Sequence, residues 1–219
     1  MKVGTDGVLL GAWANIPEAA RSILDIGTGT GLIALQLAQR CDCETIDAIE
    51  IEDGAFEQAV ENFENSPWSD RLFCYHASLE EFNAEIDDRY DLIVCNPPYF
   101  NGTYPSKGLE RNLARHSQQM SFESLLIAVS DLMTPEGTCA FVIPYELEGN
   151  FTDLARKKNL FPLRITRVRG RAEGPLKRIL IQMGREKSSL CEKELIIEKE
   201  RHVYTDEYVA LVKDFYLNM

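Results

Sequence analysis

The sequence lacks features that mark several classes of protein. No apolar run approaches the about 18 residues of a transmembrane helix, so we expect no membrane partner. There is no Cys-x-x-Cys pair and only three histidines occur, which argues against a zinc site and predicts no bound metal. Basic residues are scarce, because 23 Lys and Arg stand against 35 Asp and Glu, and the net charge is −12. Taken alone, this balance argues against a nucleic-acid partner.

What the sequence does contain is typical of a globular protein. Hydrophobic residues make up 45% and charged residues 26% of the 219 residues, which excludes a disordered or collagen-like chain. We find no repeat or linker and predict a single domain over residues 1–219. The stretch Val8–Ala14 resembles the apolar part of a signal peptide, but it is short and follows the acidic Asp6. We interpret it as a short amphipathic helix over a core, in a cytoplasmic protein whose six cysteines are free thiols.

The charges are distributed unevenly along the chain. Residues 156–187 contain eleven Lys and Arg against two Glu, whereas residues 42–91 contain sixteen acids against two Arg. A basic segment in an acidic chain favours a binding site for a polyanion at that end of the protein. A solvated surface whose charges serve solubility is an equally consistent interpretation of the composition alone.

Short β-rich runs alternate with segments of helical periodicity through most of the chain. The strands predicted in this part are residues 22–26, 45–51, 71–76, 90–95 and 138–143. The helices predicted with them are residues 30–40, 53–65, 122–133 and 149–159. The alternation predicts an α/β fold with a doubly wound, mostly parallel sheet. Residues 163–168 and 178–183 flank Gly170–Pro175 and predict a C-terminal antiparallel hairpin, which brings the sheet to seven strands; residues 195–198 are a candidate further edge strand.

A glycine-rich turn follows the first predicted strand. It reads Asp25-Ile26-Gly27-Thr28-Gly29-Thr30-Gly31, and glycines here permit tight turns and close contact between the backbone and a ligand. The spacing is GxGxG, not the GxGxxG of dinucleotide-binding enzymes. Glu50 ends the next strand, where a carboxylate can accept hydrogen bonds from both hydroxyls of a ribose. A plain strand-to-helix turn is the alternative interpretation.

The motif Asn96-Pro97-Pro98-Tyr99 directly follows the fourth predicted strand, at the sheet edge where ligands bind in such folds. Both prolines lack an N–H group and stiffen the loop. The Asn96 side-chain oxygen and the Pro97 carbonyl can converge on an NH₂ donor, while Tyr99 can stack on a planar ring. A proline-rich turn without a function is the alternative interpretation.

Together these motifs resemble those of class I methyltransferases, which have a Rossmann-like fold, and of the branch that methylates amino groups with S-adenosylmethionine. A narrower resemblance extends over most of the chain. The segments Met1–Trp13, Asn96–Phe100, Leu113–His116 and Asp214–Leu217 are similar to those of the bacterial tRNA1(Val) (adenine-37-N6)-methyltransferases. The resemblance implies that a short segment precedes the opening motif, and we expect this sequence to lack it.

The resemblance implies S-adenosylmethionine as cofactor and tRNA as partner. The residues implied to act in catalysis are Asn96, Pro97, Pro98 and Tyr99. The residues implied to bind the cofactor are Lys2, Thr5, Asp6, Asp25, Gly27, Thr28, Gly29, Gly31, Glu50, Ile51, Ser78, Leu79 and Asn96. The candidates for RNA contact, given their charge, are Arg111, Arg115, Arg164, Arg167, Arg169, Arg171, Lys177 and Arg178.

Two of these assignments have stated alternatives. Ser78 stands where the family often has an acid for the adenine of the cofactor, so its hydroxyl or nearby backbone groups would make that contact. Arg167 and Arg169 could instead form an exposed strand face. His76 is interpreted as a residue at the end of a strand, not as a catalytic base.

We expect direct methyl transfer to the N6 amine of adenine 37. Hydrogen bonds from this amine to Asn96 and Pro97 would aim its lone pair at the methyl group and stabilise the positive charge that develops on nitrogen. Tyr99 would hold the base after it leaves its stack. Alternative enzymes would keep the cofactor and methylate rRNA guanine N2, DNA adenine or a release-factor glutamine. Outside the enzymes, the fold could serve as a non-catalytic RNA-binding module.

Overall fold

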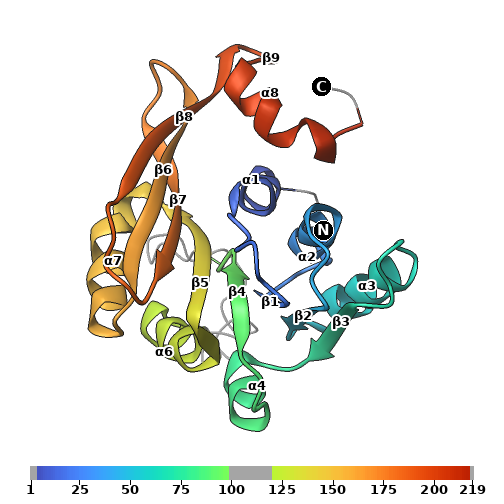
Figure 1. The fold of residues 1–219 in the computed structure, drawn as a ribbon. Coiled ribbons are helices and arrows are strands. Elements are labelled where there is room, and N and C mark those ends of the chain that lie inside the picture. The colour runs from blue at the N-terminus through green and yellow to red at the C-terminus, as the bar shows by residue number, and fades with distance from the viewer. Residues whose placement is uncertain (1–3, 99–119, 218–219) are drawn as a thin grey trace, which may run out of the picture.

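The computed structural model describes residues 4–98 and 120–217, and one sheet runs through them. Its strands are β1 (Ser22–Ile26), β2 (Thr45–Glu50), β3 (Leu72–His76), β4 (Tyr90–Cys95), β5 (Met133–Pro144), β6 (Phe161–Arg171), β7 (Leu176–Gly184), β8 (Cys191–Glu200) and β9 (Val203–Tyr204). They lie in the order β3-β2-β1-β4-β5-β7-β6-β8-β9 (Figure 1). Strands β1 to β5 are parallel, β7 is antiparallel to β5 and β6, and β8 is parallel to β6.

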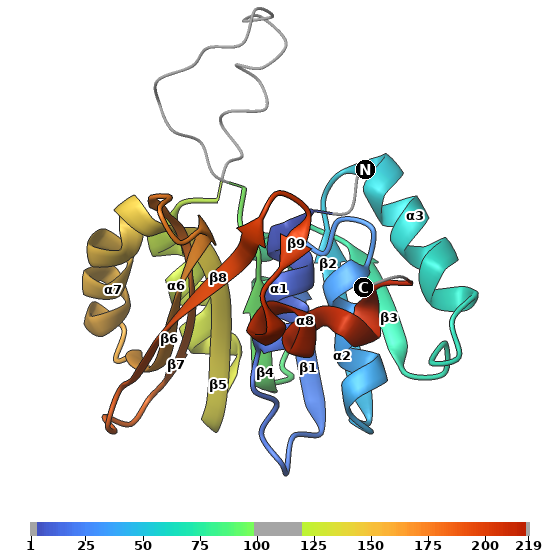
Figure 2. The ribbon, with the colours of Figure 1, turned by 90° about the horizontal axis from the view of Figure 1, so that it is seen from above.

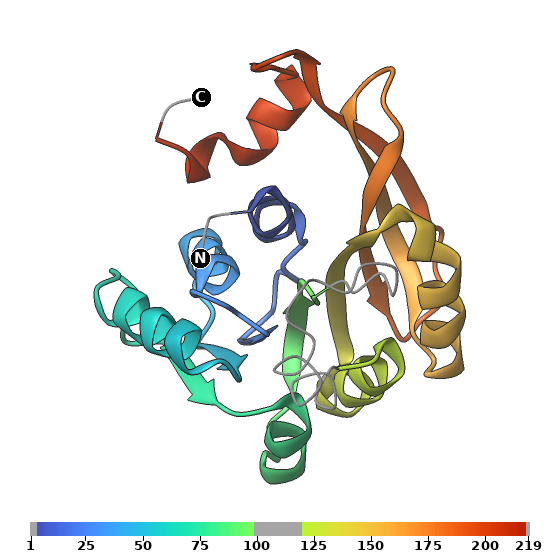
Figure 3. The ribbon, with the colours of Figure 1, turned by 180° about the vertical axis from the view of Figure 1, so that it is seen from behind.

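Helices cover both faces of this sheet (Figures 1 and 3). One face carries α1 (Thr5–Trp13), α2 (Leu32–Arg40) and α3 (Asp53–Glu64), and α8 (Asp206–Val212) packs over α1. The other face carries α4 (Leu79–Glu85), α6 (Phe122–Leu132) and α7 (Glu148–Lys157). Among residues 4–98 and 120–217, no helix has the length and apolar character needed to cross a membrane.

The doubly wound α/β sheet and its C-terminal hairpin confirm the predicted fold class, but the predicted count of seven strands is wrong. The described residues form nine strands, because β8 and β9 extend the sheet beyond the hairpin. Strand β8 is hard to recognise in the sequence, since four of its ten residues are glutamates, which are depleted in strands. The structure compensates by pairing three of these side chains, Glu192, Glu194 and Glu198, with arginines of β6.

Helix α1 differs from the predicted amphipathic helix, because residues 7–13 are all buried. It packs on α2 on one side and is covered by α8 on another. Gly11 permits the close approach to α2, since a Cβ there would lie 2.2 Å from the Gln36 side-chain oxygen. At the end of the helix, the Trp13 indole donates a hydrogen bond to the Thr166 hydroxyl over 2.9 Å. A helix that is apolar on all sides needs such complete coverage.

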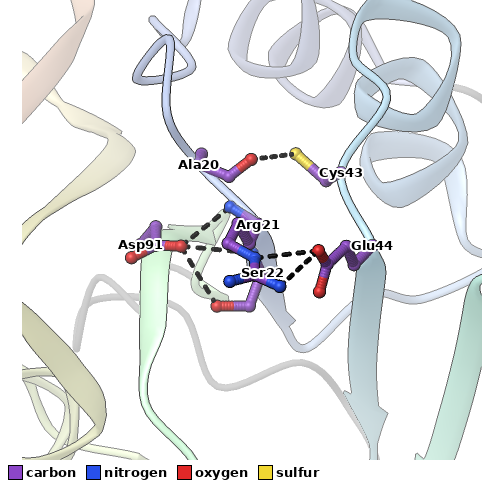
Figure 4. A network of polar contacts seen from close by, with 6 residues as sticks. All are labelled: Ala20, Arg21, Ser22, Cys43, Glu44 and Asp91. Atoms are coloured by element: carbon purple, nitrogen blue, oxygen red, sulfur yellow. Dashed lines mark hydrogen bonds and ion pairs between the residues drawn. The ribbon is translucent and has the colours of Figure 1, made fainter.

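The parallel strands begin at one edge of the sheet and end at the other, and different groups lie at these two edges. At the starting edge, the Asp91 carboxylate accepts from the backbone N–H groups of Arg21 (2.8 Å) and Ser22 (3.3 Å), and the Arg21 guanidinium pairs with Glu44 (Figure 4). This polar network joins the starts of β1, β2 and β4. The opposite, carboxyl edge carries the glycine-rich turn and Asn96, and the turn between β6 and β7 lies on the same side (Figure 2).

Candidate active site

Three parts of the predicted site lie side by side at the carboxyl edge of the sheet. Ile26, the last residue of β1, is in register with Ile49 of β2 on one side and with Cys95 of β4 on the other. The residues that follow these three are Gly27, Glu50 and Asn96. The central strands of the sheet therefore bring the glycine-rich turn, the acid and the start of the Asn-Pro-Pro motif to one level.

The glycine-rich turn has a backbone that only glycine adopts readily. Gly27, Gly29 and Gly31 have φ angles of +68°, +63° and +84°. Gly31 also caps the start of α2, and a Cβ there would lie 2.4 Å from the Phe63 ring. The Gly27 N–H donates to the Ile49 carbonyl over 2.9 Å, which fixes the turn against β2. The turn thus presents backbone at the carboxyl edge, directly before α2.

Asp25 holds this turn from below and is completely buried. One carboxylate oxygen, Oδ2, accepts from the Thr28 hydroxyl (2.6 Å) and from the Ala34 N–H (3.2 Å). The other oxygen, Oδ1, accepts no hydrogen bond from any described residue and is itself buried. Burial raises the pKa of Asp25 from 3.8 to about 7, against the lowering effect of its two donors. Such an acceptor suits a ligand that brings a hydrogen-bond donor or a positive charge.

Glu50 links the glycine-rich turn to the corner after β2, the backbone of Ile51 and Glu52 between β2 and α3. Its Oε2 accepts from the Gly29 N–H over 2.8 Å. Its Oε1 accepts from the N–H groups of Ile51 (2.8 Å) and Glu52 (2.9 Å). Each carboxylate oxygen offers more than one lone pair, so Glu50 can orient the turn and still accept from ligand hydroxyls.

His76 and Phe56 form a support for this corner that the sequence analysis did not assign to the site. The two rings stack with centroids 4.8 Å apart. His76 is the last residue of β3, as expected, and its Nε2 lies 3.2 Å from the Ile51 carbonyl. Ile51 itself is half exposed beside this pair. No local motif signals the stack, because it joins α3 to the end of β3.

Ser78 has a different local role from the cofactor contact implied for it. Its hydroxyl caps α4, accepting from the Glu81 N–H (3.2 Å) and donating to the Glu81 carboxylate (2.7 Å). The hydroxyl therefore belongs to a capping box, which the motif Ser-x-x-Glu could have signalled. Leu79 is buried directly after it, and Thr5 is exposed at the start of α1. Their predicted cofactor contacts stay predictions.

The Asn-Pro-Pro motif leaves the sheet between β1 and β5, the two neighbours of β4. Asn96 is half-buried, Pro97 is buried and Pro98 is exposed. This gradient carries the chain from the core to the surface within three residues. The predicted site residues that lie outside the described part of the chain are Lys2, Tyr99, Arg111 and Arg115.

Three arginines predicted to contact RNA have carboxylate partners in this structure. Arg167, Arg169 and Arg171 alternate along β6, and glutamates alternate along the parallel strand β8. The ion pairs are Arg167 with Glu148 and Glu192, Arg169 with Glu194, and Arg171 with Glu198. Carboxylate hydrogen bonds raise the pKa of Arg167 further. We call these residues the Arg–Glu ladder; period-two spacing in both segments was the signal for it.

The remaining basic candidates differ from one another. Arg164 stacks over the Trp13 ring at 4.3 Å and donates to the Trp13 carbonyl over 3.1 Å. These contacts hold the last residue of α1 against β6. Arg178 pairs with Asp6, at 2.6 Å between Nε and Oδ1. Lys177 is exposed and has no ion pair with a described residue. RNA contact by these residues stays a prediction.

Comparison with known proteins places these features in a family. The model of the methyltransferase small domain family matches residues 7–129. A tRNA1(Val) (adenine(37)-N6)-methyltransferase from Flavobacterium psychrophilum is 55% identical over the whole chain, which covers 94% of that protein. Relatives of the same name from Bacteroides fragilis and Trichodesmium erythraeum are 46% and 43% identical, over 100% and 99% of the chain and 92% and 91% of their own lengths.

Solved structures support the fold independently of close sequence similarity. A predicted O-methyltransferase from Agrobacterium tumefaciens superposes with a TM-score of 0.73 at 19% identity, covering 95% of this chain and 96% of its own. A ribosomal protein L11 methylase from Lactobacillus delbrueckii gives 0.58 at 18% identity, with coverage of 83% and 77%. The fold is therefore the Rossmann-like class I methyltransferase fold. On its sequence identity to full-length relatives, the chain belongs to the tRNA1(Val) (adenine(37)-N6)-methyltransferase family.

Proposed function

We propose that this protein transfers a methyl group from S-adenosylmethionine to the N6 amine of adenine 37 in tRNA1(Val). The observation that carries the proposal is the row formed by Gly27, Glu50 and Asn96 on adjacent strands, in a chain whose full-length relatives bear the corresponding name. This row sets a cofactor-binding turn directly beside a motif suited to hold an amine. Residues 1–219 would act as one methyltransferase domain, and a tRNA substrate would place it in the cytoplasm.

S-adenosylmethionine, when bound, supplies an electrophilic methyl group. The chain has groups that fit this cofactor. The buried Asp25 Oδ1 accepts nothing from the described residues, so an ammonium group would satisfy it. Glu50 would accept from the ribose hydroxyls, and the backbone of Gly27–Gly31, with Thr28, would border the amino-acid part. The other residues proposed to border or cover the cofactor are Lys2, Thr5, Asp6, Ile51, Ser78, Leu79 and Asn96.

Catalysis would depend on positioning. The Asn96 side-chain oxygen and the Pro97 carbonyl would accept hydrogen bonds from N6 of the adenine and stabilise the charge that develops on it. Pro98 would keep the loop stiff, and Tyr99 would stack on the extruded base. The proton can leave the nitrogen after it becomes positively charged, so no strong general base is needed.

RNA would bind at the carboxyl edge, where the turn between β6 and β7 lies on the same side as the end of β4 (Figure 2). Lys177 is an exposed candidate that has no ion pair with a described residue. To bind RNA, the arginines of the Arg–Glu ladder would have to release their glutamate partners and bind phosphates instead. Arg111 and Arg115 are proposed as further contacts from the sequence alone.

The test is methyl transfer from labelled S-adenosylmethionine to unmodified total tRNA, followed by nucleoside mass spectrometry. We expect N6-methyladenosine in tRNA and a rate about 100-fold lower in Asn96→Ala, because one acceptor to the developing charge is lost. Asn150→Ala, an exposed asparagine of α7, is the matched control and should keep the wild-type rate.

Parallel substrates separate the alternatives. Total DNA, ribosomal RNA and a release factor receive the same treatment, and label in one of them without label in tRNA would refute the tRNA assignment. Binding of tRNA without binding of S-adenosylhomocysteine would indicate a non-catalytic RNA-binding module.

A further inference from the structure

Asp6 and Arg178 form an ion pair between two elements that serve different ligands in the proposed function. Asp6 lies in the first turn of α1 and was assigned to the cofactor, whereas Arg178 lies on β7 and was assigned to RNA. Their Oδ1 and Nε atoms are 2.6 Å apart, and the side chains are only 26% and 29% exposed. Asp6 thus occupies a guanidinium that an RNA phosphate would need.

The ion pair holds a helix start that has little else to fix it. The residue before α1 is Gly4, so no side chain caps the helix. The first turn of any helix also lacks acceptors for its N–H groups and frays readily. Asp6 stands among these N–H groups, and its carboxylate reaches the cation on the sheet.

The Asp6 end of the ion pair lies close to the proposed cofactor site, and the Arg178 end lies at the carboxyl edge of the sheet. Gly7, next to Asp6, packs on the start of α2, since a Cβ there would lie 3.3 Å from the Leu32 side chain. Leu32 directly follows the glycine-rich turn. Arg178 is in register with Pro144, the last residue of β5, at the carboxyl edge of the sheet. The pair therefore ties the first turn of α1, beside the glycine-rich turn, to the edge that would receive RNA.

We propose that Arg178 is a positioning residue for the cofactor: through Asp6 it fixes the first turn of α1 over the cofactor site, and it does not bind RNA phosphate. This inference rests on the proposed function. Lys177, its neighbour on β7, lies where the pairing of β6 with β7 is irregular and has no partner in the register, whereas Arg178 is in register with Val168. Lys177 is exposed and has no ion pair with a described residue, so it is free to meet a phosphate. Of these two adjacent cations, Arg178 would position the cofactor site and Lys177 would contact RNA.

Loss of Arg178 would leave the Asp6 carboxylate three-quarters buried without its cation. Burial already raises the pKa of Asp6, and Arg178 is the group that lowers it. The carboxylate would then have to take up a proton or turn toward water, and either change would release the first turn of α1. Cofactor affinity would fall, because binding would have to restore the order of that turn.

The test compares Arg178→Gln with the matched neighbour Lys177→Gln in two binding assays. S-adenosylhomocysteine is titrated by calorimetry, and tRNA is titrated by fluorescence anisotropy without cofactor. For Arg178→Gln we expect the Kd for S-adenosylhomocysteine to rise about tenfold and the Kd for tRNA to stay within about twofold. For Lys177→Gln we expect the reverse, a weaker tRNA complex and unchanged cofactor binding.

Further variants show whether a loss of cofactor affinity comes from the broken ion pair or from a general loss of structure. Asp6→Asn should match Arg178→Gln, and the double variant should lose no more than either single one, because both act through one contact. Arg178→Lys should recover part of the affinity. Hydrogen exchange of residues 4–13 should accelerate in Arg178→Gln and not in Lys177→Gln.

Two results would overturn the inference. Weaker tRNA binding with unchanged cofactor affinity in Arg178→Gln would make Arg178 a phosphate contact. Additive losses in the double variant would show that the two residues act separately. Failure of the proposed function itself would appear in the wild-type protein, as absence of S-adenosylhomocysteine binding or of tRNA methylation.

Discussion

Replacing Asp25 with asparagine should remove a pH dependence that this buried carboxyl imposes on folding and on cofactor binding. The carboxyl is completely buried, and its two hydrogen-bond donors meet only one of its oxygens. Burial disfavours the charged form, so the pKa of Asp25 rises from 3.8 to about 7. Asparagine has the same shape and stays neutral over this range.

The sign and size of the effect follow from proton binding. Between the two pKa values the folded protein keeps a proton that the unfolded chain has lost, so the free energy of unfolding falls as pH rises toward 7. The contribution of the group is complete below pH 3.8 and is lost above the folded pKa. Between pH 5 and pH 8 the loss is about 3 kcal/mol, at 1.36 kcal/mol for each pKa unit. A cationic ligand reverses the preference, because it favours the carboxylate.

The assay is urea unfolding of both proteins from pH 5 to pH 8, with and without S-adenosylhomocysteine. The difference in unfolding free energy, Asp25→Asn minus wild type, should rise by about 3 kcal/mol over this range without ligand. Calorimetry in buffers of different ionisation enthalpy should show proton release when the wild type binds ligand near pH 6.5, and none in the variant. Parallel pH profiles of the two unliganded proteins, together with no proton release, would refute the role of a buried, protonated Asp25.

Two further substitutions probe the turn and the ladder. Gly31→Ala should lower the free energy of unfolding by about 2–4 kcal/mol, because its φ of +84° disfavours a side chain and the new Cβ would meet the Phe63 ring; a wild-type urea midpoint would contradict this. The double variant Glu194→Gln/Glu198→Gln should bind non-cognate tRNA more tightly at low salt, with a salt slope steeper by about one for each arginine that it frees. An unchanged slope in anisotropy titrations between 50 and 200 mM salt would show that the ladder does not compete with RNA.

The position of the glycine-rich turn, Glu50 and Asn96 at one edge of the sheet could be predicted from the sequence, because their signals are local. Positive φ angles favour glycine wherever the turn lies. Glu50 ends β2 and Asn96 directly follows β4, and the apolar run of each strand reveals it in the sequence. Parallel strands then bring their carboxyl ends to one edge by geometry alone. The sequence does not reveal that Glu50 also accepts from the Gly29 N–H, because that contact joins two strands.

Features that depend on strand register could not be predicted in the same way. The Arg–Glu ladder exists because β8 adds parallel to β6 in a register that brings Glu194 within reach of Arg169 and sets Glu198 opposite Arg171. A long-range parallel pairing of this kind has no turn signal in the sequence. The burial of α1 has a similar origin, since α8 from the other end of the chain covers it. The positive charge of β6 was interpreted without the glutamates of β8, and the apolar character of α1 was interpreted without its cover, α8.

The ladder also changes what the charge distribution implies about RNA. The basic segment 156–187 suggested a polyanion site by its composition, but most of its arginines near β6 and β7 already meet carboxylates. The pair of Arg171 with Glu198 is partly exposed, and such pairs contribute little to stability, so a phosphate would displace this carboxylate at small cost. The mostly buried pair of Asp6 with Arg178 is not of this kind. An RNA that fits the site would bring its phosphates to the positions where they replace the glutamates, whereas other polyanions would not. The glutamates would therefore weaken unspecific RNA binding more than binding of the substrate. On the proposed function, the acidic partners would then help a chain of net charge −12 to select one RNA, in addition to pairing β8 with β6.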